Sequence, residues 1–232
     1  MTELLGPEEW TAVALSLRVA FWATFASLPF GIAVAFVLAR LEFPGKQILN
    51  GLVHLPLILP PVVTGYLLLV TFGRTGPVGA FLDEHFGVVL AFRWTGAALA
   101  AAIMAFPLMV RAIRLALEAV DPKLEQAAST LGAARPLVFA TVTLPLILPG
   151  VLAGAVLAFA KAMGEFGATI TFVSNIPGQT QTVPSAIYAF LQVPGGEEQA
   201  LRLVVVSIAI AMAALLVSES VARRVARRIS GS

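Results

Sequence analysis

The chain has 232 residues, of which 59% are hydrophobic, 12% are charged and none is cysteine. This composition is too apolar for a soluble domain, and the lack of cysteine excludes a disulfide framework and thiol chemistry. The formal net charge is +2, but the basic residues are scattered without interleaved aromatic side chains, so no nucleic-acid partner is indicated. We therefore expect an all-α membrane protein.

Five long stretches contain no Asp, Glu, Lys or Arg. A bilayer core of about 30 Å needs roughly 20 predominantly apolar residues for each helical crossing. Charged residues at the ends of these stretches, such as Arg18 and Lys161, can extend to the lipid–water interface. The sequence therefore predicts five transmembrane helices in one transmembrane domain over residues 1–232, and the stretches are Val19–Ala39, Gln47–Gly73, Trp94–Val110, Pro136–Ala160 and Leu203–Ser218.

Basic residues concentrate in alternate connecting segments, and the cytoplasmic side of a membrane protein is normally enriched in Lys and Arg. The segment before Arg18 has three glutamates and no basic residue. We therefore expect the N-terminus outside and the C-terminus inside. Ten of the fifteen basic residues lie in the segments predicted to be inside, namely Arg40, Lys46, Arg111, Arg114, Lys123, Arg135, Arg223, Arg224, Arg227 and Arg228.

The second predicted helix combines prolines with a histidine. His54 precedes Pro56, Pro60 and Pro61, and proline kinks a helix because it lacks a backbone N–H and clashes with the preceding turn. An inward histidine there would either line a path or fill a packing position, and the sequence leaves both interpretations open. His85 belongs to the outer connecting segment, and two histidines without cysteine give no metal-ligand cluster.

A small polar helix interrupts the apolar sequence between the third and fourth crossings, in a cytoplasmic loop at about 119–136. Asp121 suits an N-cap, Pro122 the first helical position and Gly132 a left-handed C-terminal stop. The sequence predicts a short amphipathic helix over Lys123–Leu131 and a restart at Pro136. Its small apolar stripe suits docking into a groove of a partner, although packing on the membrane surface or on its own bundle remains open. The stripe consists of Leu124, Ala127, Ala128 and Leu131.

The fourth predicted helix carries two further patterns. Gly150 and Gly154 form a GxxxG motif, which permits close helix contact within the chain or across a dimer. Lys161 and Glu165 are four residues apart and can pair on one helix face. The pair is interpreted as structural or as part of a gate.

The segment Gly164–Glu198 is uncharged from Phe166 to Gly196 but contains many polar residues and Gly/Pro breaks. Such a segment suits lipid exposure poorly, because backbone groups freed at the breaks find no water in the bilayer. We expect an outer, partly re-entrant segment with a short helix near Ser185–Leu191. A sixth crossing here, which would place both termini on one side, remains the alternative.

The stretch QAASTLG followed by VTLP resembles the cytoplasmic loop of ATP-binding-cassette (ABC) importer permeases. The family pattern is Glu-Ala-Ala, three residues, Gly, nine residues, an aliphatic residue, one residue and Leu-Pro. This chain departs at Gln126, which stands in place of glutamate with Glu125 just before it. The remaining pattern positions are Ala127, Ala128, Gly132, Val142, Leu144 and Pro145.

This resemblance implies that the short helix is a coupling helix, which fits a cleft in an ATPase subunit and carries its closure into the membrane. The family glutamate is missing at position 126, which puts in doubt any ion pair made there. The residues that the resemblance assigns to ATPase coupling are Lys123, Leu124, Glu125, Gln126, Ala127, Ala128, Leu131 and Gly132.

Three further stretches resemble permease subunits of bacterial molybdate importers, which belong to the molybdate/sulfate group of type I ABC importers. They are MGEFGATITFVSNIPGQTQTVPSAIY, LPLILPPVVTGYLLL and FGRTGPVG. The resemblance implies the type I permease fold and transport of molybdate or a related tetrahedral oxyanion across the inner membrane by alternating access. It also implies a homodimer of this chain, two ATP-binding subunits and a periplasmic molybdate-binding protein.

The phosphate-binding pattern GxxxxGK followed by Ser or Thr is absent from the sequence. We therefore expect no ATP site of the usual kind in this chain. The family resemblance implies no cofactor here and no enzyme activity of its own, with ATP and Mg bound by the partner subunit. An intramembrane enzyme is also disfavoured because no nucleophile with a base is evident. An ion-gradient-driven secondary transporter of a small anion remains the alternative, although no clear internal repeat is visible.

An oxyanion crossing a low-dielectric passage needs hydrogen-bond donors that hold it weakly enough for release. The polar segment after the fourth helix supplies neutral donors beside Gly and Pro breaks. A polar loop that only caps the bundle is the competing interpretation. The candidate path or gate residues are Thr169, Thr171, Ser174, Asn175 and Thr182.

Overall fold

The structure is a computed structural model that describes residues 5–230, and the regular elements of this part are helical. This confirms the all-α prediction. The elements are α1 (Pro7–Arg40), α2 (Lys46–Ile58), α3 (Pro61–Phe72), α4 (Pro77–Phe86), α5 (Trp94–Glu118), α6 (Pro122–Thr130), α7 (Arg135–Val138), the π-helix η1 (Phe139–Thr143), α8 (Leu144–Met163), α9 (Gly167–Val173), α10 (Val183–Leu191) and α11 (Glu197–Ser230).

Four helical runs of the described chain are long and apolar enough to cross a membrane: α1, α5, the run Arg135–Met163 and Glu197–Val217 of α11. The pair α2 and α3 makes a fifth crossing if its two bent halves count as one span. The chain is thus a multi-pass membrane protein, as predicted. The alternative of a sixth crossing within Gly164–Glu198 is not met in the described residues. A crossing needs a helix of roughly 20 residues, whereas α9 has 7 residues and α10 has 9.

The prediction of one helix over Gln47–Gly73 is wrong. The axes of α2 and α3 differ by 113°, and the break lies at Leu59 and Pro60, whose backbones are extended with ψ of 143° and 134°. Two consecutive prolines remove two backbone donors, and a residue before proline avoids the helical region. The prolines therefore end the helix rather than kink it.

Several helices extend beyond the charge-free stretches that predicted them. The first starts at Pro7, α5 continues past Arg111 and Arg114 to Glu118, and α11 starts at Glu197. Charged residues end a stretch of hydrocarbon-compatible sequence, but they do not end a helix. The helix α4 lies in a segment predicted as a loop, although Pro77 at its start and the left-handed Gly87 at its end are ordinary helix boundaries.

Small residues let the central helices approach closely. Added Cβ atoms at Gly150 and Gly154 would meet Ala116 and Met109 of α5, so the GxxxG contact lies within one chain. Packing through small side chains is the usual basis of helix association in membranes. Alanines dominate the buried core along α1 and α5, including Ala20, Ala23, Ala97, Ala100 and Ala101.

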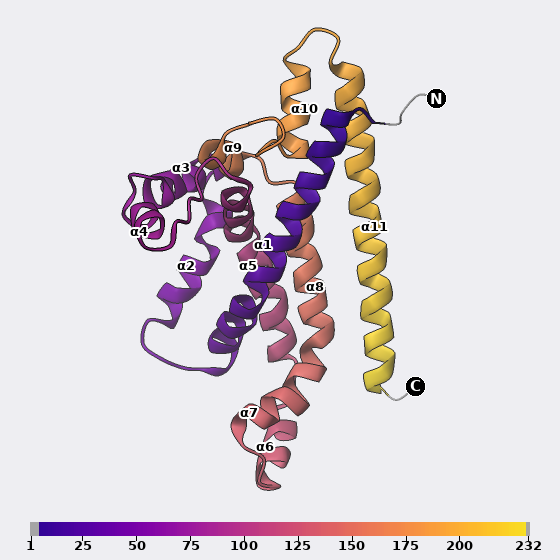
Figure 1. Cartoon of the computed structure of the whole chain (residues 1–232). Coiled ribbons are helices and arrows are strands. Elements are labelled where there is room, and N and C mark those ends of the chain that lie inside the picture. The colour runs from indigo at the N-terminus through magenta and orange to yellow at the C-terminus, as the bar shows by residue number, and fades with distance from the viewer. Residues whose placement is uncertain (1–4, 231–232) are drawn as a thin grey trace.

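The two ends of the bundle carry different elements (Figure 1). One end holds the start of α1 together with α10 and the start of α11, and we call it the α10 end. The other holds α6, α7 and the last turns of α11, and we call it the α6 end. The first and last long helices thus begin at the same end, and α11 finishes at the opposite end from the start of α1.

Candidate coupling helix and polar segment

The predicted short helix is present as α6 at the tip of the α6 end (Figure 1). Asp121 caps it, because its Oδ1 accepts the backbone N–H of Lys123 at 2.9 Å. At its other end Gly132 has φ of +88°, and the N–H groups of Gly132 and Ala133 donate to the carbonyls of Ser129 at 3.0 Å and Ala128 at 3.3 Å. This pair of bonds is a Schellman motif, which requires a left-handed residue.

The residues of α6 all keep part of their surface exposed. Leu124 is 48% exposed and Leu131, just after the helix, is 89% exposed. Large apolar side chains left in this state on a protruding element are typical of a contact surface. Of the other predicted coupling residues, Ala128 is half-buried, and Lys123, Gln126, Ala127 and Gly132 are exposed.

Glu125 differs from the other predicted coupling residues because its carboxylate binds this chain. Oε1 accepts a hydrogen bond from Arg40 Nη2 at 3.1 Å and another from Thr143 Oγ1 at 2.8 Å. The Glu125 side chain is 25% exposed. Neither partner was predicted from the sequence. Arg40 was interpreted only as a basic residue of a connecting segment, and Thr143 lay within the crossing predicted over Pro136–Ala160.

The restart after α6 is less regular than predicted. It begins at Arg135, and the π-helix η1 separates the four-residue α7 from α8. Residues in a π-helix are rare and often lie at functional sites. Thr143, the last residue of η1, is 2% exposed, and its hydroxyl faces Glu125 of α6.

The five candidate path residues differ in exposure. Thr169 and Thr182 are 3% and 4% exposed, Thr171 and Asn175 are half-buried, and Ser174 is exposed. Local bonds already occupy the threonine hydroxyls, since Thr169 donates to Phe166 O at 2.9 Å and Thr171 to Gly167 O at 2.8 Å. An anion would thus have to compete with these bonds, or the segment would have to change conformation.

The polar segment packs into the molecule more tightly than a surface loop. A Cβ atom added to Gly65 of α3 would lie 2.5 Å from the carbonyl oxygen of Ala168 in α9. The predicted short helix near Ser185–Leu191 is confirmed as α10, which begins two residues earlier at Val183, whereas α9 was not predicted. The helix α9 has only seven residues, and the polar residues in and around it did not indicate a helix in the sequence.

Lys161 and Glu165 form the predicted ion pair, with Nζ and Oε2 2.7 Å apart. The Glu165 side chain is 1% exposed, and its other oxygen accepts the N–H of Ala168 at 3.0 Å. The carboxylate thus joins the end of α8 to the start of α9, which favours the structural interpretation of the pair.

The two histidines each bond within their own helix. His54 Nδ1 lies 2.9 Å from Asn50 O, and His85 Nδ1 lies 3.1 Å from Phe81 O. Among the residues searched, those the structure describes, no group of three or more His, Cys, Asp or Glu could hold a metal ion.

An ion pair at the α10 end joins the first and last helices. Glu9 Oε1 accepts from Arg202 Nε at 3.0 Å, and the Glu9 side chain is only 3% exposed. Nearby, Ser16 Oγ accepts the N–H of Val183 at 2.7 Å, which links α1 to the start of α10. Neither contact had a sequence signal, because the partners lie 193 and 167 residues apart.

Known proteins resemble this chain over nearly its whole length. The chain is 63% identical over 220 residues to the molybdenum transport system permease protein ModB of Escherichia coli K12, covering 95% of this chain and 96% of the relative. It is 56% identical over 221 residues to ModB of Haemophilus influenzae, with 95% and 96% covered.

A crystal structure of a bacterial alginate ABC transporter, in complex with an alginate pentasaccharide-bound periplasmic protein, has the same fold at 17% identity. Its TM-score is 0.75, with 95% of this chain and 80% of that chain covered. Residues 27–231 match the model of the binding-protein-dependent transport system inner membrane component. The chain therefore belongs to this family of membrane subunits of binding-protein-dependent transport systems.

Proposed function

We propose that this chain is the permease subunit of an ATP-driven importer that moves molybdate, or a related tetrahedral oxyanion, across the bacterial inner membrane. The observation that carries the proposal is the exposed helix α6, closed by Gly132, in a chain 63% identical to a molybdenum permease. Such a helix presents Leu124 and Leu131 to a partner. It explains why an apolar chain contains a short polar helix.

In this proposal two copies of the chain bind two ATP-binding subunits, and a periplasmic molybdate-binding protein delivers the anion. ATP and Mg are bound by the ATP-binding subunits, and this chain is a transport subunit rather than an enzyme. The chain also contacts membrane lipid and no nucleic acid. The single transmembrane domain covers residues 1–232, and the coupling loop covers about 119–136.

The proposed orientation places the α6 end in the cytoplasm, with the N-terminus outside and the C-terminus inside. The distribution of Lys and Arg supports it, as does the position of α6 at the end opposite the start of α1 (Figure 1). Closure of the ATPase dimer displaces the coupling residues 123–128 and 131–132, and the bundle turns outward. Hydrolysis returns it inward.

The proposed path or gate includes Thr169, Thr171, Ser174, Asn175 and Thr182. These side chains lie in the segment that connects α8 to α10, on the side from which a binding protein delivers substrate in the proposed orientation. Exposed Ser174 is the member available to an anion in this conformation. Alternating access supplies the movement that frees the threonine hydroxyls from their local bonds.

The test is uptake of labelled molybdate into liposomes that contain this chain and its ATP-binding subunit. ATP is enclosed, and loaded binding protein is added outside. We expect uptake that requires ATP and resists excess sulfate. Uptake inhibited by sulfate would shift the substrate within the oxyanion class, and uptake driven by a proton gradient without ATP would support the secondary transporter instead.

A further inference from the structure

We infer that Arg40, Glu125 and Thr143 form a joint through which α6 moves α1 and η1 together. Glu125 then serves transport from inside the chain and not as part of the ATPase-binding surface. This inference rests on the proposed function, because it concerns how movement of the coupling helix enters the membrane helices. We call these three residues the α6 joint.

The α6 joint connects three elements that are distant in sequence. One oxygen of Glu125, on α6, receives hydrogen bonds from Arg40 Nη2 at the last residue of α1 and from Thr143 Oγ1 at the last residue of η1. Arg40 Nη2 also lies 3.4 Å from the carbonyl of Val120, just beyond α5. The guanidinium thus holds the ends of α1 and α5 and the start of α6 in one place.

These contacts are partly shielded from water. The Arg40 and Glu125 side chains are 17% and 25% exposed, and Thr143 is 2% exposed. Hydrogen bonds to ionised groups are stronger than neutral ones, and reduced solvent strengthens them further. The Glu125 carboxylate is thus bound within its own chain. A carboxylate that binds a partner subunit would instead project into solvent in the isolated chain.

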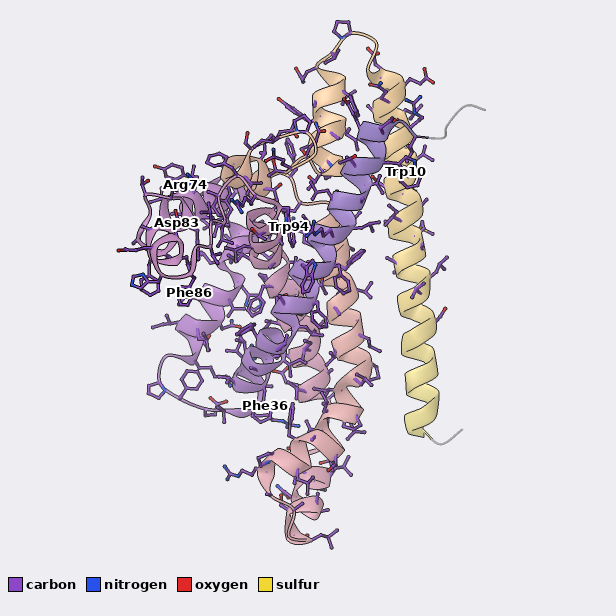
Figure 2. All side chains as sticks on the ribbon, in the orientation of Figure 1. Trp10, Phe36, Arg74, Asp83, Phe86 and Trp94 are labelled. Carbon is purple, nitrogen blue, oxygen red and sulfur yellow. The ribbon has the colours of Figure 1, made fainter. Side chains whose placement is uncertain are left out.

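A second contact joins the same elements one turn away. The rings of Phe36 on α1 and Phe139 on η1 meet edge to face, with centroids 5.4 Å apart and planes at 86°. Figure 2 shows Phe36 near the α6 end of α1. Both ends of η1 therefore contact neighbours that move with α6 or α1, Phe139 through its ring and Thr143 through its hydroxyl.

Apart from its covalent links to α5 and α7, α6 has few neighbours. The helix packs on α7 and η1, and its remaining surface is largely exposed. A π-helix has an extra residue in each hydrogen-bonded turn, and such turns are frequent at functional sites. When α6 is displaced, the α6 joint couples the end of α1 to η1, and through η1 to α8.

The experiment uses the assembled complex of this chain with its ATP-binding subunit in liposomes, and measures ATP hydrolysed per molybdate taken up. Glu125→Gln, Arg40→Gln and Thr143→Val each remove part of the α6 joint. Allosteric coupling energies correspond to factors of about 5 to 150, and we expect each variant to raise the ratio by roughly tenfold. Binding of the ATP-binding subunit is expected to stay at the wild-type level.

Thr143→Val is the most informative variant, because Thr143 is buried and does not reach the ATPase surface. The matched control is Glu42→Gln, which removes the Lys46–Glu42 ion pair of 2.7 Å at the same end without touching α6. It should keep the wild-type ratio. Arg40→Lys preserves the charge and should restore part of the coupling lost in Arg40→Gln.

Two outcomes decide the inference, and a third bears on the proposed function. A raised ratio in Thr143→Val with normal subunit binding, and no further rise when Glu125→Gln is added, supports a joint that acts as a unit. A normal ratio in Thr143→Val together with weakened subunit binding in Glu125→Gln overturns it and returns Glu125 to the ATPase surface. Absence of ATP-dependent uptake in the wild type counts against the proposed function itself, before any variant is compared.

Discussion

The helix α6 and the polar segment that leads into α10 differ in which side chains they leave exposed. At the α6 end Leu124 and Leu131 stay exposed. At the α10 end polar side chains are buried, including Thr180 at 1% and Thr182 at 4% exposure. The comparison teaches that a polar segment that looks like a loop can be part of the packed interior, whereas a short helix recognised by its caps can stand outside it.

The tight packing of the polar segment gives the largest expected effect. Gly65→Val would place a side chain 2.5 Å from Ala168 O and 2.9 Å from Thr171 Cβ, as judged from the Cβ position. Overpacking a dense core costs about 3 kcal/mol of unfolding free energy. The measurement is unfolding of the detergent-solubilised chain, followed by circular dichroism.

The matched control for Gly65→Val is Gly51→Val in α2, where an added Cβ meets nothing within 4 Å. It should leave stability unchanged or slightly higher, because valine is the better helix former. Equal stability of the two variants would mean that α3 and α9 are loosely packed, and the contrast between the two ends would disappear.

The ion pair at the α10 end gives the next effect. Arg202 binds two carboxylates, Glu9 with 3% and Glu198 with 84% side-chain exposure. Glu9→Gln removes the shielded carboxylate that faces the Arg202 guanidinium, and it should lower the free energy of unfolding by more than Glu198→Gln does. Glu198→Gln should cost less than about 0.5 kcal/mol, because exposed pairs contribute little.

Thermal unfolding of both variants beside the wild type checks this prediction. The two substitutions are chemically identical and act on the same arginine, so their difference isolates burial. A larger loss in Glu198→Gln than in Glu9→Gln would contradict the interior character of the α10 end.

Sequence reasoning was most successful where one local signal determined the structure. Asp121, Pro122 and Gly132 located α6 to within one residue at each end, because capping depends on neighbours in sequence. The apolar stretches likewise located the long helices. Their ends were misplaced, since residues such as Arg111 interrupt hydropathy without interrupting backbone hydrogen bonding.

The features that were missed depend on distant parts of the chain. Nothing near Glu125 indicates that Arg40 will turn its carboxylate inward from 85 residues away. The same holds for α9, whose seven residues gain their order from α3 and α5. Short helices are marginal alone, so tertiary contacts decide them and local patterns cannot.

Gly132 tests the α6 end with a smaller effect, mainly on coupling. An added Cβ meets nothing within 4 Å there, and aspartate tolerates the left-handed backbone better than most residues, so Gly132→Asp should leave the chain folded at a cost of about 1 kcal/mol. Its carboxylate would lose water when the surface beside Leu131 docks, and an unpaired buried charge is unfavourable. We expect roughly tenfold less uptake per ATP hydrolysed.

The control is Gly178→Asp at the α10 end. Gly178 has φ of +75°, and a Cβ atom added there also meets nothing within 4 Å. Both glycines therefore have a left-handed backbone and open space around the added side chain. It should keep wild-type coupling to ATP hydrolysis. Equal loss in the two variants would attribute the effect to the backbone and remove the distinction between the ends.

Ser174 gives the smallest expected effect and bears on the polar segment as a gate. Its φ of 64° and ψ of −167° lie in a region that essentially only glycine adopts, at a cost of about 1 to 3 kcal/mol. Ser174→Gly relieves this strain but loses roughly 0.5 to 1 kcal/mol to backbone entropy. The net expectation is stabilisation by about 1 kcal/mol in the same unfolding measurement.

Ser174→Ala separates strain from the hydroxyl, because alanine keeps the Cβ atom and so keeps the strain. It should therefore show no gain in stability. If Ser174→Gly is more stable yet transports more slowly, while Ser174→Ala transports normally, the strained backbone itself serves the gate. If Ser174→Ala alone loses uptake, the hydroxyl is the group that meets the anion. If both variants transport as the wild type does, Ser174 is not part of the proposed path. This position of the α10 end then contributes to packing and not to anion transport.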